Sequence, residues 1–357
     1  MSNRIQRMLK TAVRQPYLLH CMRRRRLVKP LFLRYAVTWR CNARCVMCDI
    51  WKVNTPDSTH QELTVDQMAR IIERDREFLS DLSEIGLTGG EPFLRSDLVE
   101  LVRLLHASFP QARVSLVSNG QLTGRILTCL EQIREFFPEL VFSVSLDGIG
   151  EAHDRARGLP GAYDKAMTTL KGALKLGFTV TSGMTIGSHN YDQIMPLSRQ
   201  LSEMGIDFSC NMQERGANFN NSGRAEDLAP SQLAGVTRAL EEFPHHFYMD
   251  NLRSLISGGK RSLPCFAGYT SYFLNPNGDV SLCNLISRSI GNLREMPFRT
   301  LSDADAAWKL RNELSSCTCW SQCEVKSSAA SAPWHIARWF LKSRHKRKIL
   351  RQYLGKK

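Results

Sequence analysis

Two stretches of this 357-residue sequence contain no acidic residue. No Asp or Glu precedes position 49, and none occurs from Pro333 to Lys357. Eleven basic residues precede Cys41 and nine follow Pro333, so removing these twenty charges from the net +14 leaves about −6 on the rest. The chain is therefore an acidic body with two basic ends.

Long apolar runs are also absent. No window approaches the roughly 18 uninterrupted apolar residues of a membrane span, and the apolar run at 17–22 is broken by His20. This run is too short for the core of a signal peptide. The length and the 43% hydrophobic composition fit a globular chain with one large domain and a smaller one. We therefore expect a cytoplasmic protein.

Cysteine, in contrast, is abundant and clustered. Eight of the eleven cysteines fall into three groups, at 41/45/48, 265/283 and 317/319/323. In a reducing compartment such groups indicate metal ligands or reactive thiols rather than disulfides.

From position 31 the sequence alternates β-rich runs with helical patterns. The predicted strands are 31–37, 84–88, 112–117, 140–146, 178–186 and 206–212, and the predicted helices are 65–79, 97–107, 123–136, 163–176 and 191–204. Such alternation predicts parallel strands with helices outside. Six units are two short of a closed (β/α)8 barrel, so the expected α/β fold is a partial (β/α)6 TIM-type barrel.

The alternation stops after position 215. A segment rich in Gly, Asn and Ser follows at 216–231, and YFLNPNGDVSLC at 272–283 predicts a hairpin about an Asn-Pro-Asn-Gly-Asp turn. A further helix is predicted at 303–314. The expected organisation is a basic amphipathic segment (1–30), the barrel (31–215), a linker and helix (216–260), a small cysteine-bearing domain (261–330) and a basic C-terminal helix (331–357).

Three cysteines directly follow the first predicted strand, in CNARCVMC with the spacing C-x3-C-x2-C. In a β/α barrel this loop lies at the C-terminal face, where active sites are built. Four thiolates complete a zinc site or an iron–sulfur cube, whereas three leave a coordination position open for a ligand. A zinc site with a distant fourth cysteine is the alternative interpretation.

A second motif, LTGGEPFL at 87–94, follows the second strand. Its paired glycines permit close backbone approach, and its Glu91 supplies a carboxylate at the strand end. Alone, it is compatible with a tight turn. Together with C-x3-C-x2-C one unit earlier, it resembles the radical S-adenosylmethionine (SAM) superfamily.

The resemblance implies that Cys41, Cys45 and Cys48 hold a 4Fe–4S cluster whose fourth iron is chelated by SAM. It further implies that Glu91 accepts a hydrogen bond from the SAM ammonium, with Gly89 and Gly90 alongside. The family usually has an aromatic residue before the third cysteine, and this sequence has Met47.

Two later strand ends carry the resemblance further. In VSNG (117–120), Ser118 and Asn119 are implied SAM contacts, and in SVSLDGIGEAHDRARG (143–158), Ser145 and Asp147 are implied to reach the ribose. Arg157 is implied to pair with the SAM carboxylate, a bidentate match suited to guanidinium. An Asp-Gly turn followed by a solvated Arg is the alternative for the second segment.

The remaining cysteine groups resemble the auxiliary SPASM or shorter twitch extensions of this superfamily. Cys265 and Cys283 lie in a C-x12-G-x4-C pattern, followed by IGNL and CTCWSQCE. Five cysteines suffice for one auxiliary 4Fe–4S cluster. The expected ligands are Cys265, Cys283, Cys319 and Cys323, with Cys317 replacing one of them or free. A structural zinc site is the alternative, since iron and zinc share thiolate ligands.

Cys210 lies near the end of the sixth predicted strand. If its thiol faces the barrel interior, it is a candidate catalytic donor of a hydrogen atom to a substrate radical, and otherwise it is a small core residue. Gln213, Glu214 and Arg215 follow at the same rim and are candidate substrate contacts.

The function implied is that of a radical SAM oxidoreductase or transferase. Such an enzyme cleaves SAM reductively and abstracts hydrogen from an unactivated C–H bond of a peptide, a sugar or alcohol, or a lipid-linked small molecule. A flavodoxin or ferredoxin is the expected electron donor. The alternative is a zinc-stabilised binding protein. For the basic ends, peripheral membrane contact and solvated helices are favoured over nucleic acid.

Overall fold

The computed structural model describes residues 14–53, 62–216, 219–221, 228–243, 246–286 and 288–343. Most of the predicted amphipathic segment before position 14, much of the predicted 216–231 linker and the basic run after position 343 lie outside the described residues.

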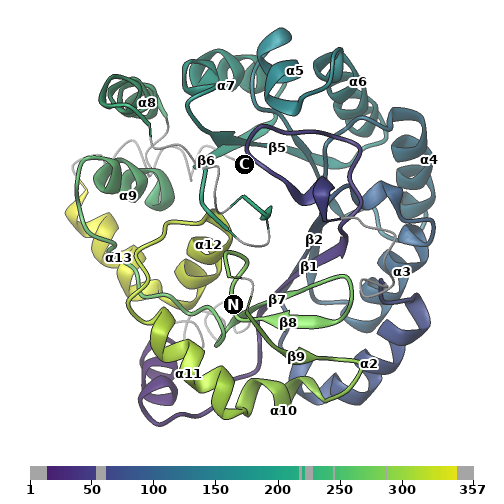
Figure 1. Ribbon diagram of the computed structural model, residues 1–357, viewed down its shortest axis with the longest axis vertical. Coiled ribbons are helices and arrows are strands. Elements are labelled where there is room, and N and C mark those ends of the chain that lie inside the picture. The colour runs from purple at the N-terminus through teal and green to yellow at the C-terminus, as the bar shows by residue number, and fades with distance from the viewer. Residues whose placement is uncertain are drawn as a thin grey trace, which may run out of the picture.

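Six parallel strands form the barrel portion of the sheet (Figure 1). They are paired in chain order, each with the next, from β1 to β6. Their bounds are β1 (Phe32–Thr38), β2 (Glu84–Gly89), β3 (Arg113–Ser118), β4 (Val141–Ser145), β5 (Thr179–Ile186) and β6 (Asp207–Met212). All six predicted strands are confirmed, and the partial barrel with them.

Helices cover the outer face of this curved sheet (Figure 1). They are α2 (Val65–Leu79), α3 (Leu98–Ser108), α4 (Thr123–Arg134), α5 (Glu151–Arg157), α6 (Ala162–Lys175) and α7 (Ile194–Glu203), with short 3-10 turns η1 (Ile50–Lys52), η3 (Pro92–Leu94) and η4 (Tyr191–Gln193). Helix α2 begins at a capping box in which Thr64 and Gln67 satisfy each other's backbone N–H groups. Helix α5 had no counterpart among the predicted helices.

The C-terminal third extends the same sheet. The predicted hairpin is confirmed as β7 (Ser271–Leu274) and β8 (Asp279–Ser281), which pair antiparallel, and β9 (Ser289–Asn292) adds a third strand. Strand β7 also pairs in parallel with β1, so that Phe32 lies opposite Ser271. The sheet therefore has nine strands in the order β6-β5-β4-β3-β2-β1-β7-β8-β9.

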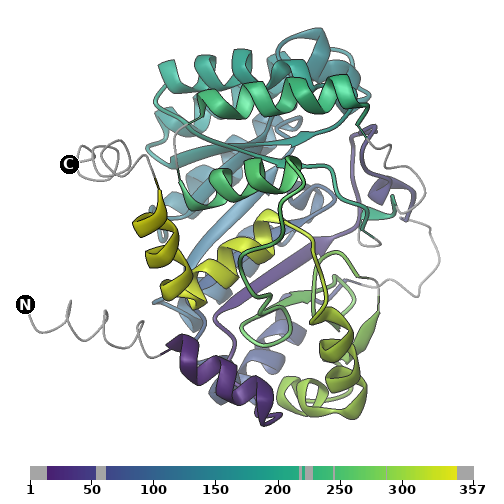
Figure 2. The ribbon, with the colours of Figure 1, turned by 90° about the vertical axis from the view of Figure 1, so that its left-hand side faces the viewer.

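The remaining helices follow β6 in the sequence. They are α8 (Pro230–Glu242), α9 (Phe247–Ile256), α10 (Phe298–Asp303), α11 (Asp305–Leu314), α12 (Gln322–Ser331) and α13 (Pro333–Lys342). Figure 1 shows α12 between β6 and β7, where a closed barrel would have its last two strands. Residues 14–23 form a further helix, which Figure 2 shows near α13 on one side of the molecule. None of the helices in the described ranges has the length and hydropathy needed to cross a membrane.

The two faces of the parallel strands differ in composition. Residues pointing outward, such as Tyr35, Leu87 and Phe142, are fully buried in the main hydrophobic core against the helices. Many residues pointing inward are small or polar, as at Ser115, Ser143, Gly183 and Ser209, and they line cavities together with Val117 and Val141. Closed barrels fill this space with bulky branched side chains, whereas this sheet encloses an open lumen.

Candidate active site

The loop that carries the first three cysteines is fixed by helix α5. The backbone N–H groups of Arg44 and Val46 donate to the carbonyls of Arg157 and Ala156, at 3.0 and 2.9 Å. Gly158 ends α5 with a φ of +64°, and a Cβ there would lie 2.5 Å from the Arg44 carbonyl oxygen. Only glycine combines this conformation with so close a contact.

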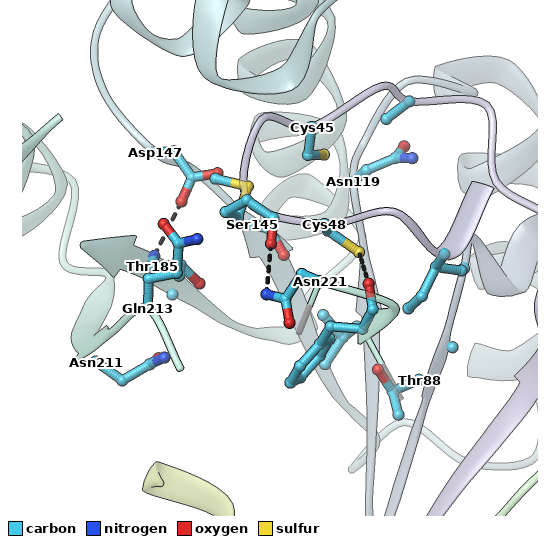
Figure 3. A pocket seen from close by; sticks show the side chains of 18 of the residues that line it. Cys45, Cys48, Thr88, Asn119, Ser145, Asp147, Thr185, Asn211, Gln213 and Asn221 are labelled. Atoms are coloured by element: carbon cyan, nitrogen blue, oxygen red, sulfur yellow. Dashed lines mark hydrogen bonds between the residues drawn. The ribbon is translucent and has the colours of Figure 1, made fainter. Parts of the chain in front are cut away.

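Cys41, Cys45 and Cys48 line one cavity of about 350 Å³ at the C-terminal end of the lumen (Figure 3). Asn119 Nδ2 lies 3.9 Å from Cys41 Sγ, and Arg157 Nη1 lies 3.7 Å from Cys45 Sγ. Burial raises the pKa of Cys41 to about 11 and that of Cys48 to about 12. The thiolate forms therefore need a positive partner, such as iron, beside them.

The paired glycines bring two strand ends together. A Cβ on Gly89 would lie 2.2 Å from the Thr38 carbonyl oxygen, and one on Gly90 would lie 2.1 Å from the Arg40 carbonyl oxygen. The Gly90 N–H donates to Thr38 O at 2.8 Å. The two glycines thus allow close contact with the backbone of Thr38 and Arg40, which leads into the cysteine loop. Both glycines also line the cavity.

Glu91 organises the cavity wall from behind. Its fully buried carboxylate accepts hydrogen bonds from Ser118 Oγ at 2.9 Å, from the Asn119 N–H at 2.7 Å and from the Phe93 N–H at 3.3 Å. Burial raises the pKa of Glu91 to about 7. Ser118 and Asn119 line the cavity in front of it, and contact between Glu91 and the SAM ammonium stays a prediction.

Asp147 and Arg157 form a buried ion pair at the cavity wall. Arg157 Nη2 lies 2.8 Å from Asp147 Oδ2, and Asp147 Oδ1 accepts from the Thr185 N–H at 2.9 Å (Figure 3). Burial lowers the pKa of Arg157, but Asp147 and the neighbouring cysteines offset this, so that the net shift is upward. Ser145 lines the same cavity. The predicted contacts of these residues with SAM stay predictions.

The structure also identifies cavity residues that the sequence analysis did not single out. Thr185 and Asn211 project from β5 and β6, and Asn221 Nδ2 donates to the Met47 carbonyl at 2.8 Å (Figure 3). The sequence held a signal for Thr185 and Asn211. A strand buried on both faces is continuously hydrophobic, whereas TVTSGMTI and DFSCNM alternate polar with apolar residues. Asn221 had none, because it belongs to no regular element.

A second cavity of about 380 Å³ adjoins the first toward the N-terminal ends of the strands. Ser143, Ser209 and Cys323 line both cavities, which therefore form two chambers of one lumen. The far chamber is bordered by charged residues, including an ion pair between Arg34 and Glu84 at 2.9 Å.

The structure corrects the register expected for Cys210. Its side chain is fully buried in the helix-facing core, and burial raises its pKa to about 12. Ser209 and Asn211, on either side, take the lumen-facing positions. The expectation that this thiol faces the cavity is therefore wrong by one residue. Gln213 and Glu214 do line the cavity, whereas Arg215 is not one of its lining residues.

The five C-terminal cysteines lie around the start of α12. Besides burial, Cys317 raises the pKa of both Cys265 and Cys283, so these three side chains are electrostatic neighbours. Cys317 and Cys319 share a hydrogen bond that lowers the pKa of Cys317 to about 6 and raises that of Cys319. Cys323 lines the lumen instead. The structure thus brings Cys317, whose role the sequence left open, close to Cys265 and Cys283.

A positive charge accompanies these thiols as well. Arg261 Nη1 donates to the Cys319 carbonyl at 2.6 Å and lies 3.7 Å from Cys319 Sγ. In the described ranges, no three His, Cys, Asp or Glu side chains converge on one metal-ion position. An iron–sulfur cube is bound through its irons by separate thiolates, and both cysteine groups supply soft thiolate donors with N–H groups nearby, which suits such clusters.

Fold and site together define an α/β partial-barrel protein with a thiolate-lined centre at the carboxyl ends of its strands. Comparison with sequence models of known families identifies the family of the chain. The sequence model of the radical SAM superfamily matches residues 35–201, and that of the SPASM iron–sulfur cluster-binding domain matches residues 265–324. The chain belongs to the radical SAM superfamily and carries a C-terminal SPASM domain. This membership implies a 4Fe–4S cluster and SAM, and the SPASM domain implies auxiliary iron–sulfur clusters. The assignment of individual cysteines to these clusters stays a prediction.

Similar proteins have diverse names. The chain is 25% identical to the "Antilisterial bacteriocin subtilosin biosynthesis protein AlbA" of Bacillus subtilis, over 79% of this chain and 61% of that protein. It is 26% identical to the "AdoMet-dependent heme synthase" of Methanosarcina barkeri, over 79% of this chain and 85% of that protein.

A crystal structure of Streptococcus suis SuiB bound to S-adenosylmethionine has the same fold. Its TM-score is 0.61 at 16% identity, covering 80% of this chain and 68% of that one. The chain spans only 61% of AlbA.

Proposed function

We propose that this protein cleaves SAM reductively and uses the resulting 5′-deoxyadenosyl radical to abstract hydrogen from a C–H bond of a substrate held in the lumen. The observation that carries the proposal is the placement of Cys41, Cys45 and Cys48 around one lumen that the parallel strands enclose. A radical formed there would meet a substrate rather than solvent or packed side chains.

Each part of the cavity wall has a role in this proposal. The three cysteines hold the cluster, which when bound and reduced supplies the electron that breaks a carbon–sulfur bond of SAM. Asn119 and Arg157 direct N–H groups toward the sulfurs of Cys41 and Cys45. Such contacts stabilise thiolate charge and so tune the potential of a cluster. An external flavodoxin or ferredoxin is the proposed source of the electron.

A peptide is the substrate class that we favour. AlbA is named for bacteriocin biosynthesis, and SuiB has been crystallised with its precursor peptide SuiA. The lumen is compatible with a polar chain, because Ser115, Ser143 and Ser209 offer hydroxyl groups along it. Cys323, one of the proposed auxiliary ligands, lines the same lumen as the first cysteine group.

Anaerobic reconstitution tests the proposal. We expect the wild-type protein to hold about eight irons, one four-iron cube at each cysteine group, and to form 5′-deoxyadenosine from SAM under dithionite. The triple variant Cys41→Ala/Cys45→Ala/Cys48→Ala should keep about four irons and form none. Cys129→Ala, a substitution on α4, is the matched control and should behave as wild type.

A colourless protein that contains zinc and makes no 5′-deoxyadenosine would refute the proposal. That result would favour the zinc-stabilised binding protein. Full iron content in the triple variant would also count against it, because the first cysteine group would then hold no cluster.

A further inference from the structure

The two basic ends of the chain meet on one side of the molecule. Buried Gln15 Nε2 lies 2.9 Å from His335 Nδ1, and Gln15 Oε1 accepts from the Trp334 N–H at 3.2 Å. These bonds join the helix at residues 14–23 to the start of α13, and Figure 2 shows both along the same edge. Segments about 320 residues apart in the sequence thus contribute to one surface.

Helix α13 turns apolar residues outward. On its inner side, Trp339 Nε1 donates to Asp250 Oδ2 at 3.1 Å and the ring packs against Phe247. Its outer positions, spaced as one helical face, are all exposed: Trp334, Ala337, Arg338, Leu341 and Lys342. Trp334 is 56% and Leu341 68% exposed. The solvent-facing side of a surface helix usually carries polar and charged residues, whereas this face combines Trp334 and Leu341 with two cations.

The N-terminal helix has a similar outer face. Tyr17 is 58% exposed, and His20, Arg23 and Arg24 follow at helical spacing with their side chains in solvent. No acidic residue occurs in 14–29 or in α13. Aromatic and aliphatic groups among cations, without acids, form the composition of helices that lie in a membrane interface.

A cationic cavity lies beside this face. It measures about 350 Å³, and its walls include Arg14, Tyr17, Lys29, Asp81 and Arg299. Its three cations outnumber Asp81 in the wall and Glu77 beside Lys29, so the cavity keeps a net positive charge. Lys29 Nζ donates to Ser80 Oγ at 3.0 Å and lies 4.0 Å from Glu77. A phosphate monoanion or phosphodiester matches this charge, and guanidinium groups such as those of Arg14 and Arg299 suit phosphate oxygens.

We propose that this surface, formed by residues 14–29, α13 and the Arg14/Lys29/Arg299 cavity, docks on an anionic lipid membrane, with a lipid phosphate in the cavity. Nucleic acid is less favoured as the partner, because the exposed Leu341 can neither pair with a phosphate nor stack on a base. The proposal is independent of the proposed reaction. It places the protein at the membrane surface.

Co-sedimentation of the full-length protein with vesicles tests this surface. We expect binding to phosphatidylcholine vesicles that contain phosphatidylglycerol, no binding to pure phosphatidylcholine, and weakening at high salt. Each cation near an anionic surface is worth about fivefold in affinity. Arg338→Glu/Lys342→Glu and Arg14→Gln/Arg299→Gln should therefore each weaken binding about 25-fold or more.

Lys171→Glu/Lys175→Glu on α6 is the matched control, because both lysines are exposed and lie away from this surface. It should bind as wild type does. Brominated lipids provide a second measurement that does not depend on the charge variants: they should quench the tryptophan emission of wild type more than that of Trp334→Phe.

Equal loss of binding in the control, equal binding to neutral and anionic vesicles, or binding of a DNA duplex but not of vesicles would each overturn the proposal.

Discussion

Arg157 Nη2 lies 2.8 Å from Asp147 Oδ2 while Nη1 of the same guanidinium lies 3.7 Å from Cys45 Sγ. One side chain thus connects the carboxylate at the end of β4 with the cysteine loop after β1. The pair is almost completely buried, with 1% of the Asp147 side chain exposed. Charge at the first cysteine group is therefore set in part by Asp147.

Asp147→Asn should destabilise the protein markedly. The amide oxygen of the new side chain would remain as an acceptor for the Thr185 N–H, but Arg157 would become a buried charge without its carboxylate. Breaking one side of such a pair costs about 3–5 kcal/mol. Urea unfolding of the cluster-free protein measures this loss.

The double variant Asp147→Asn/Arg157→Gln is the control for this pair. It should be less destabilised than the sum of the two single variants, because neither charge is then left alone. Strict additivity would show that the two side chains act separately.

The pH dependence of stability should reflect two buried groups that act in opposite directions. Burial and Arg157 lower the pKa of His153 to about 4 from 6.5, so stability is lost as pH falls from 6.5 to 4. Burial raises the pKa of Glu91 to about 7 from 4.5, so stability is lost as pH rises from 4.5 to 7. Each effect is roughly 3 kcal/mol, and between pH 4.5 and 6.5 they largely cancel.

Substituting one of the two residues should reveal the effect of the other on the pH dependence of stability. In His153→Asn, the free energy of unfolding relative to wild type should decline as pH rises from 4.5 to 6.5, and in Glu91→Gln it should increase over the same range. Urea titrations of the cluster-free proteins give these difference curves. Parallel curves for both variants would show that neither pKa is shifted as described.

The two chambers of the lumen can be filled separately. Gly183 lines the chamber of the three cysteines, and a Cβ there meets only Ser209 Oγ, at 3.9 Å, so a larger side chain would extend into the open space. Gly183→Leu should cost about 1–3 kcal/mol of SAM binding, measured by equilibrium dialysis on the reconstituted protein.

Ser115→Leu is the matched substitution, because Ser115 lines the far chamber. It should leave SAM binding and substrate-free 5′-deoxyadenosine formation unchanged. Equal loss in both variants would mean that the chambers are not separate binding spaces.

Much of the barrel was predictable because its signals are local. Strand β3 and its neighbours are short β-rich runs between amphipathic helices, and each helix presents one apolar stripe. The motif residues were predictable for a similar reason, since Cys41 and Glu91 follow directly from strands whose ends meet at one edge.

Other features depend on partners far away in the sequence. Helix α5 is only seven residues long and is stabilised by contact with the cysteine loop, so its own sequence indicates little. The outward orientation of Cys210 is a matter of register, and a one-residue shift turns a strand side chain to the other face. The pairing of β7 with β1 follows from backbone hydrogen bonds that carry no sequence signature.

That pairing has a consequence for biosynthesis. The partner of Phe32 is Ser271, which leaves the ribosome about 240 residues later, or about 12 to 48 s at 5–20 residues per second. Until then one edge of β1 carries unpaired backbone groups able to capture another strand. The nascent chain therefore passes through an interval in which chaperone protection matters most, and a message truncated before β7 should yield aggregate rather than a free-standing barrel.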